Sequence, residues 1–128
     1  MASRLLVVDD DLDTSVHLKT LLSKEGYEVD VAFDGDEALV KLKSYDPDVI
    51  ILDLMMPKMN GFDVLKEVRE KHKDKWRPVI IISAKTELES LKTCYELEAD
   101  HYLSKPFTIE DLLRAVKVMI SLIPARLQ

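Results

Sequence analysis

Four short apolar runs in this chain each end at a polar residue, and this pattern constrains the fold more than any other feature. The runs occupy residues 5–8, 49–52, 79–82 and 102–104, and the first three are rich in Val, Ile and Leu. Short runs of this kind are typical of buried strands in a parallel sheet. We therefore expect one parallel sheet on which these strands are neighbours.

Helical patterns separate the strands. After the first run, leucines recur at the spacing of one helix face, and Gly26 is placed to close that helix in a left-handed conformation. His17 falls on the inner stripe of this helix, so we expect it to be partly buried and held by a hydrogen bond. A weakly alternating strand follows at 28–32, and Asp34 is placed to cap a second helix that ends near Tyr45.

Three further helices are predicted along the chain. One follows the Asn60–Gly61 turn, a fourth occupies residues 86–97, and a fifth is capped by Thr108 and fades at Pro124. Strict alternation of five strands with five helices predicts right-handed crossovers and helices on both faces of the sheet. A chain of 128 residues fits one such domain, residues 1–128.

Composition excludes several classes of partner. The net charge of −6 argues against direct nucleic-acid binding, which needs a basic face. No apolar stretch approaches the roughly 20 residues that span a bilayer, so no membrane partner is expected. A single cysteine and a start without a signal-peptide pattern predict the cytoplasm.

The polar residues that end the runs define a candidate site. In parallel sheets ligands bind beyond the carboxyl ends of the strands, which would bring together Asp9, Asp10, Asp53, Ser83 and Lys105. Three carboxylates in one crevice repel each other unless a cation lies among them. Hard oxygen donors without His or Cys suit Mg²⁺. A carboxylate that faces a phosphoryl group can act as nucleophile, with the lysine and the serine hydroxyl binding phosphate oxygens.

Four dispersed motifs resemble the receiver domain of two-component response regulators. They are LVVDDD at 6–11, DLMMPKMNG at 53–61, SAK at 83–85 and YLSKPF at 102–107, and the resemblance covers the whole chain in order. It implies the flavodoxin-like doubly wound α/β fold, a five-stranded parallel sheet of order 2-1-3-4-5 with five helices. It also implies a signalling domain rather than an enzyme, whose only reactions are its own phosphorylation and dephosphorylation.

The resemblance also implies individual roles. Asp53 would accept a phosphoryl group from a histidine kinase or a histidine phosphotransfer protein. Asp10, Asp53 and the backbone carbonyl of Met55 would bind Mg²⁺ directly and Asp9 through water, with Mn²⁺ or Ca²⁺ as substitutes. Lys105 would bind the phosphoryl group, and its peptide bond to Pro106 would be cis.

The expected output follows from the same resemblance. Ser83 and Tyr102 would form the switch, and the surface of the fourth helix, fifth strand and fifth helix would then control an output protein that the sequence does not name. The protein would be a monomer or a phosphorylation-dependent dimer. Because the chain ends near the fifth predicted helix, we expect no attached output domain. A stand-alone regulator, a phosphorelay intermediate and a receiver cut from a longer protein all remain open.

Two rival functions each fail at a specific position. A phosphatase of the haloacid dehalogenase type needs a second Asp two residues after the nucleophile, and that position is Met55. A flavodoxin-like flavin binder needs a loop rich in Ser, Thr and Gly after the first strand to bind the flavin phosphate. Residues 9–13 are acidic instead and would repel it.

Overall fold

The computed structural model describes residues 2–54, 61–71, 75–83 and 99–123. The strands are β1 (Arg4–Val8), β2 (Glu28–Ala32), β3 (Val49–Asp53), β4 (Val79–Ser83) and β5 (His101–Ser104). The helices are α1 (Leu12–Lys24), α2 (Gly35–Ser44), α3 (Gly61–Lys71) and α5 (Ile109–Leu122). The predicted fourth helix, residues 86–97, lies outside the described residues, so the described part of the chain contains four of the five expected helices.

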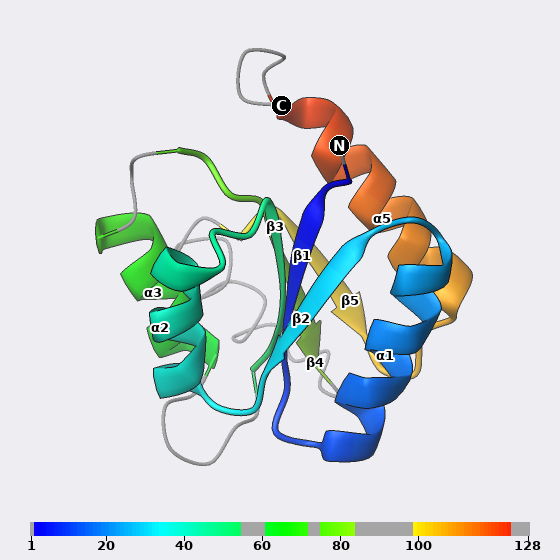
Figure 1. Ribbon diagram of the computed structural model, residues 1–128, viewed down its shortest axis with the longest axis horizontal. Helices are drawn as coiled ribbons and strands as arrows, with labels where there is room; N and C mark the ends of the chain where they lie inside the picture. The colour runs from blue at the N-terminus through cyan, green and yellow to red at the C-terminus, as the bar shows by residue number, and fades with distance from the viewer. Residues whose placement is uncertain (1, 55–60, 72–74, 84–98, 124–128) are drawn as a thin grey trace.

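The five strands form one parallel sheet in the order β2-β1-β3-β4-β5, as predicted. In Figure 1 the strands run in the same direction, and their carboxyl ends lie at the edge opposite the chain termini. The strand order reverses direction at β1, because the chain first adds β2 on one side and then β3 on the other. The carboxyl ends of β1 and β3 are therefore the point where loops diverge and leave room for a ligand.

Each face of the sheet has its own apolar core, because side chains alternate along a strand. Leu5 and Val7 of β1 belong to the core beneath α1 and α5, whereas Leu6 and Val8 belong to the core beneath α2 and α3. Figure 1 shows the two helix pairs on opposite sides of the sheet. Since both faces are covered, the central strands β3 and β4 are buried along their whole length, which explains their unbroken apolar sequences.

Local signals at the helix ends behave as the sequence predicts. The side chain of Asp34 accepts a hydrogen bond from the Glu37 amide at the start of α2, and Thr108 forms a capping box with Asp111 at the start of α5. Gly26 has a φ of 93°, the left-handed conformation expected after α1. These contacts fix where each helix begins and ends relative to the sheet.

The expectation for His17 is wrong. The buried positions of α1 are Ser15, Leu18 and Leu22, and His17 is exposed. One residue corresponds to about 100° around a helix, so His17 lies beside the buried stripe and not within it.

No helix in the described part of the chain is long and apolar enough to cross a membrane.

Candidate functional site

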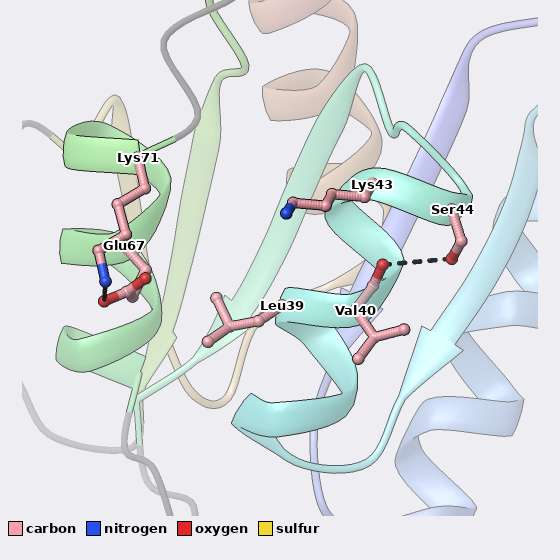
Figure 2. A pocket seen from close by; sticks show the side chains of 6 residues that line it. All are labelled: Leu39, Val40, Lys43, Ser44, Glu67 and Lys71. Carbon is pink, nitrogen blue, oxygen red and sulfur yellow. Dashed lines mark hydrogen bonds and ion pairs between the residues drawn. The ribbon is translucent and has the colours of Figure 1, made fainter.

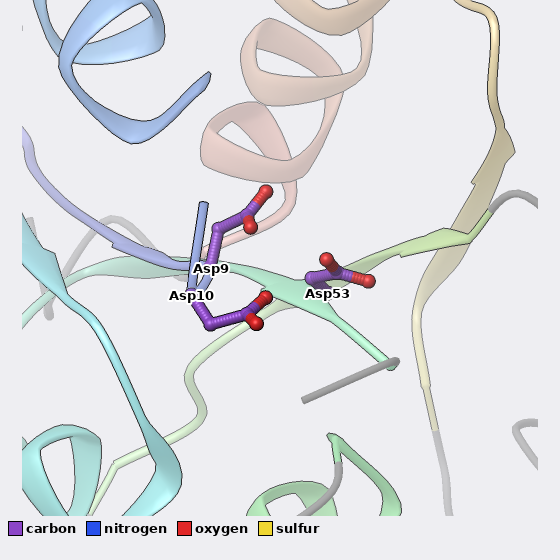
Figure 3. Close-up of side chains that lie close together, drawn as sticks. All are labelled: Asp9, Asp10 and Asp53. Atoms are coloured by element: carbon purple, nitrogen blue, oxygen red, sulfur yellow. The ribbon is translucent and has the colours of Figure 1, made fainter. Parts of the chain in front are cut away.

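Three carboxylates meet at the carboxyl edge of the sheet. Asp9 and Asp10 follow β1, Asp53 ends β3, and one oxygen from each lies within 4.8 Å of the others. Figure 3 shows the three side chains converging from the two neighbouring strands. Asp9 and Asp53 are buried, at 3% and 6% exposure, whereas Asp10 is exposed. The cluster is therefore open to an ion or ligand on the Asp10 side.

The electrostatics of this cluster favour a cation. Burial raises the pKa of Asp9 to about 6 from its ordinary value of 3.8, and the charges of Asp53 and Asp10 act in the same direction. The Asp11 amide and the Lys105 ammonium act against the rise without cancelling it. The predicted repulsion is thus present at Asp9, although loss of hydration contributes more than the neighbouring acids.

Lys105 brings the positive charge of the site. Its Nζ lies 3.5 Å from Asp53 Oδ2, and its backbone N–H donates to the Ser83 carbonyl over 2.7 Å. The Lys105–Pro106 peptide bond is cis, as the resemblance implies. The ammonium is therefore directed from the end of β5 across β4 to the carboxylate at the end of β3.

The other predicted residues lie as follows. Ser83 ends β4 with 1% exposure, directly beside the end of β3. Tyr102 lies on β5 opposite Ile81 and is partly buried against the core beneath α2 and α3. Met55 is outside the described residues. Five of the seven predicted residues, all except Tyr102 and Met55, therefore lie at the carboxyl edge of the sheet.

Gly61 is a site residue that sequence reasoning did not identify as one. Its amide donates to the Leu54 carbonyl over 3.0 Å, so α3 begins against the residue that directly follows Asp53. A Cβ on Gly61 would lie 2.6 Å from Leu54 Cα and 2.7 Å from the Asp53 carbonyl oxygen. No side chain fits there. The Asn60–Gly61 sequence indicated a turn but not this close approach.

Two surface grooves lie away from the acidic cluster. One, of about 650 Å³, runs between α2 and α3 and is lined by Leu39, Val40, Lys43, Ser44, Glu67 and Lys71. In Figure 2 Glu67 and Lys71 pair with each other on α3 while Leu39 extends from α2 into the space between the helices. The other groove, of about 330 Å³, lies between α1 and the start of α5 and includes His17. Neither groove contains a cluster of carboxylates.

In parallel α/β sheets ligands bind beyond the carboxyl ends of the strands, and the acids and the lysine at this edge suit a charged ligand. Residues 5–117 match the model of the response regulator receiver domain. The chain is 37% identical to response regulator MprA of Mycobacterium bovis over 120 residues, covering 94% of this chain and 51% of that protein. It is 38% identical to transcriptional regulatory protein DltR of Streptococcus agalactiae over 115 residues, 90% of this chain and 50% of that protein.

Solved structures agree with this match. Chemotaxis protein CheY4 of Vibrio cholerae has a TM-score of 0.87 at 34% identity, covering 93% of this chain and 99% of that one. The receiver domain of Francisella response regulator 1452 has a TM-score of 0.84 at 37% identity, covering 91% and 95%. The chain belongs to the response regulator receiver family of two-component systems. It spans about half the length of the curated relatives that it matches.

Proposed function

We propose that this receiver accepts a phosphoryl group on Asp53 from a histidine kinase or a histidine phosphotransfer protein, in the cytoplasm and with Mg²⁺. The observation that carries the proposal is the convergence of three carboxylates with Lys105, whose ammonium lies 3.5 Å from Asp53. Asp53 is the best candidate for the nucleophile because it alone among the three acids ends a central strand and faces that ammonium.

The donor set fits Mg²⁺. Carboxylate oxygens from three residues gather within 4.8 Å of one another, and the cluster contains no nitrogen or sulfur ligand. Asp10 and Asp53 would bind the ion directly together with the Met55 carbonyl, Asp9 would hold it through water, and Mn²⁺ or Ca²⁺ would substitute. When bound, the ion supplies positive charge against the phosphoryl oxygens.

The chain's own residues account for the transfer. An Asp53 oxygen forms a bond to phosphorus as the bond from phosphorus to the donor's histidine nitrogen breaks, and that nitrogen keeps the electron pair. Lys105 then pairs with a phosphoryl oxygen in place of the Asp53 carboxylate. The Ser83 hydroxyl donates a hydrogen bond to another phosphoryl oxygen. The product is an acyl phosphate, which the domain loses by hydrolysis, so it acts as a switch and not as an enzyme with turnover.

The output would pass through Ser83 and Tyr102. Ser83 ends β4, and Tyr102 lies on the adjacent strand β5. A displacement of the serine toward a phosphoryl group therefore changes the space beside β5. The surface of the predicted fourth helix, β5 and α5 would then bind an output protein or a second copy of the chain. Amide NMR with beryllofluoride, a phosphoryl mimic, checks this. Shifts should reach residues 102–113 in the wild type and shrink in Ser83→Ala, and shifts confined to the surroundings of Asp53 would contradict it.

Intact-mass spectrometry tests the phosphorylation itself. Incubation with phosphoramidate and Mg²⁺ should add one phosphoryl group to the wild type and none to Asp53→Asn. Asp36→Asn, which removes an exposed carboxylate from the first turn of α2, is the matched control and should be labelled normally. Equal labelling of Asp53→Asn and the wild type would overturn the proposal.

A further inference from the structure

Both polar groups of the Asp9 backbone, in the loop between β1 and α1, are hydrogen-bonded to neighbouring elements. Its amide donates to the Ala32 carbonyl over 3.1 Å, and its carbonyl accepts from the Ser15 hydroxyl over 2.9 Å. Its side chain also accepts from the Asp11 amide over 2.9 Å. Asp11 in turn caps α1 through the amides of residues 13 and 14. The position of this loop is therefore set by a few specific bonds.

The Ser15 bond differs from the other hydroxyl bonds of the described helices. Thr20 donates to the Val16 carbonyl, Ser44 to the Val40 carbonyl and Ser121 to the Val118 carbonyl, each three or four residues earlier on an exposed helix surface. Such bonds within a helix are the usual choice for Ser and Thr. Ser15 is fully buried and reaches back six residues, past the start of its helix, to the end of β1. It ties the helix to the loop and contributes nothing to the helix itself.

The bond acts on Asp10 through the geometry of the peptide group. The Asp9 carbonyl and the Asp10 amide belong to one planar unit, so a hydroxyl that holds the oxygen also fixes the orientation of the whole plane. That plane determines where the Asp10 Cα lies and which way its side chain leaves the loop. Asp10 is the exposed member of the acidic cluster, so packing does little to hold it.

We propose that Ser15 is a positioning residue for the cation site, because it holds the Asp9–Asp10 peptide so that the Asp10 carboxylate faces Asp53. This inference rests on the proposed function of the acidic cluster. Without the hydroxyl, the Asp9 carbonyl would be a buried acceptor with no donor among the described residues, and the peptide would rotate toward water to satisfy it. Rotation would carry Asp10 away from the other two acids.

The test measures Mg²⁺ binding by Ser15→Ala in two ways. One is amide NMR titration with Mg²⁺, and the other is the Mg²⁺ concentration that gives half-maximal labelling from phosphoramidate. Loss of a residue that orients a metal ligand typically lowers affinity by tenfold or more, and we expect a roughly tenfold weaker affinity here. The labelling rate at saturating Mg²⁺ should stay within about twofold of wild type, because Asp53 and Lys105 are untouched.

Two further variants keep the test decisive. Thr20→Ala removes a hydroxyl-to-carbonyl bond from the same helix and should leave Mg²⁺ affinity unchanged. Ser15→Thr retains the hydroxyl and should restore affinity toward that of wild type. An unchanged Mg²⁺ affinity in Ser15→Ala, or an equal loss in Thr20→Ala, would overturn the inference. A wild type that binds no Mg²⁺ would instead overturn the proposed function.

Discussion

The two edges of the sheet differ in how their carboxylates are paired with cations. At the carboxyl edge, Asp9, Asp10 and Asp53 face one lysine, and the pKa of Asp9 is raised. At the amino edge, the described residues form a cluster in which two carboxylates meet three cations. We call it the amino-edge cluster; its members are Arg4, Asp46, Asp48, Lys75 and Arg77.

The amino-edge cluster links the amino ends of β1, β3 and β4. Arg77 donates to Asp46 over 2.7 Å, Lys75 pairs with Asp46 and Asp48, and the Arg4 amide donates to Asp48 over 2.7 Å. Burial acts to raise the pKa of Asp46, but hydrogen bonds from Arg77 and Lys75 outweigh it and hold that pKa below its ordinary value. Here both carboxylates are paired with cations, whereas at the carboxyl edge the folded protein keeps an excess of negative charge available for a ligand.

Disruption of the amino-edge cluster should have the largest effect on stability. Arg77 is 3% exposed and its hydrogen bond to Asp46 is charged, so Arg77→Met removes a buried charged hydrogen bond and should destabilise the fold by up to about 3 kcal/mol. Urea unfolding measures this, with Arg114→Met as control because Arg114 is 74% exposed in its pair with Asp111. Mg²⁺ affinity should be unchanged in both variants. A large loss of Mg²⁺ affinity in Arg77→Met would contradict the separation of the two edges.

The two edges should also respond to pH with opposite signs. Because the pKa of Asp9 is about 6 when folded and 3.8 in its ordinary state, the folded protein holds more protons between these values. The free energy of unfolding without Mg²⁺ should therefore fall as the pH rises from about 4 to 6, by at most about 3 kcal/mol. The lowered pKa of Asp46 gives the reverse: its contribution is present above pH 3.8 and is lost on acidification.

Variants separate these two contributions. Unfolding measured across this pH range should show a flatter profile in Asp9→Asn, while Asp46→Asn should keep the fall between about pH 4 and 6. The same slope in Asp9→Asn and in the wild type would contradict the assignment of the raised pKa.

Mg²⁺ should stabilise the folded protein, and it should do so through the carboxyl edge alone. At a hundred times its dissociation constant, an ion that binds only the folded state adds about 2.7 kcal/mol. Asp10→Ala removes both a ligand and a repulsive charge, so it should raise the melting temperature without metal and abolish the response to Mg²⁺. Thermal unfolding checks both, and an unchanged melting temperature of the wild type in saturating Mg²⁺ would count against the site.

Two glycines give a smaller and sharper contrast. Gly61→Ala should cost about 2 kcal/mol and also weaken Mg²⁺ binding, because the new methyl group would press on the backbone of Asp53 and Leu54. Gly26→Ala should cost about 1 kcal/mol through its left-handed φ and leave the site intact, since no described atom beyond its two chain neighbours lies within 4 Å of the added carbon. Metal titration of both variants distinguishes them. Equal Mg²⁺ affinities would contradict the contact at Gly61.

The sequence predicted the sheet and the acidic cluster because both follow from local pattern. Apolar runs define the strands, parallel pairing aligns their ends, and the polar residues at those ends must meet. Caps such as Asp34 and Thr108 were also predictable, since their bonds span three residues.

What the sequence did not predict depends on distant neighbours. The exposure of His17 depends on which stripe of α1 packs against the sheet, and the tight contact at Gly61 depends on the approach of α3 to β3. The left-handed φ of 53° at Asp46 was unexpected because Asp carries a steric cost there that a Gly would not. The Asp46 amide bonds to the Lys41 carbonyl, and its side chain meets two cations, Lys75 and Arg77, from the segment before β4, which together offset that cost.

The central claim is that the carboxyl edge carries an Mg²⁺-dependent phosphoacceptor at Asp53, and borohydride trapping followed by peptide mass mapping tests it most directly. Borohydride reduces an acyl phosphate to an alcohol, so it marks the phosphorylated carboxylate permanently. After treatment with phosphoramidate and Mg²⁺, we expect reduction at Asp53 alone, and none when Mg²⁺ is omitted. Reduction at Asp9 or Asp10 in place of Asp53, or equal reduction without Mg²⁺, would contradict it.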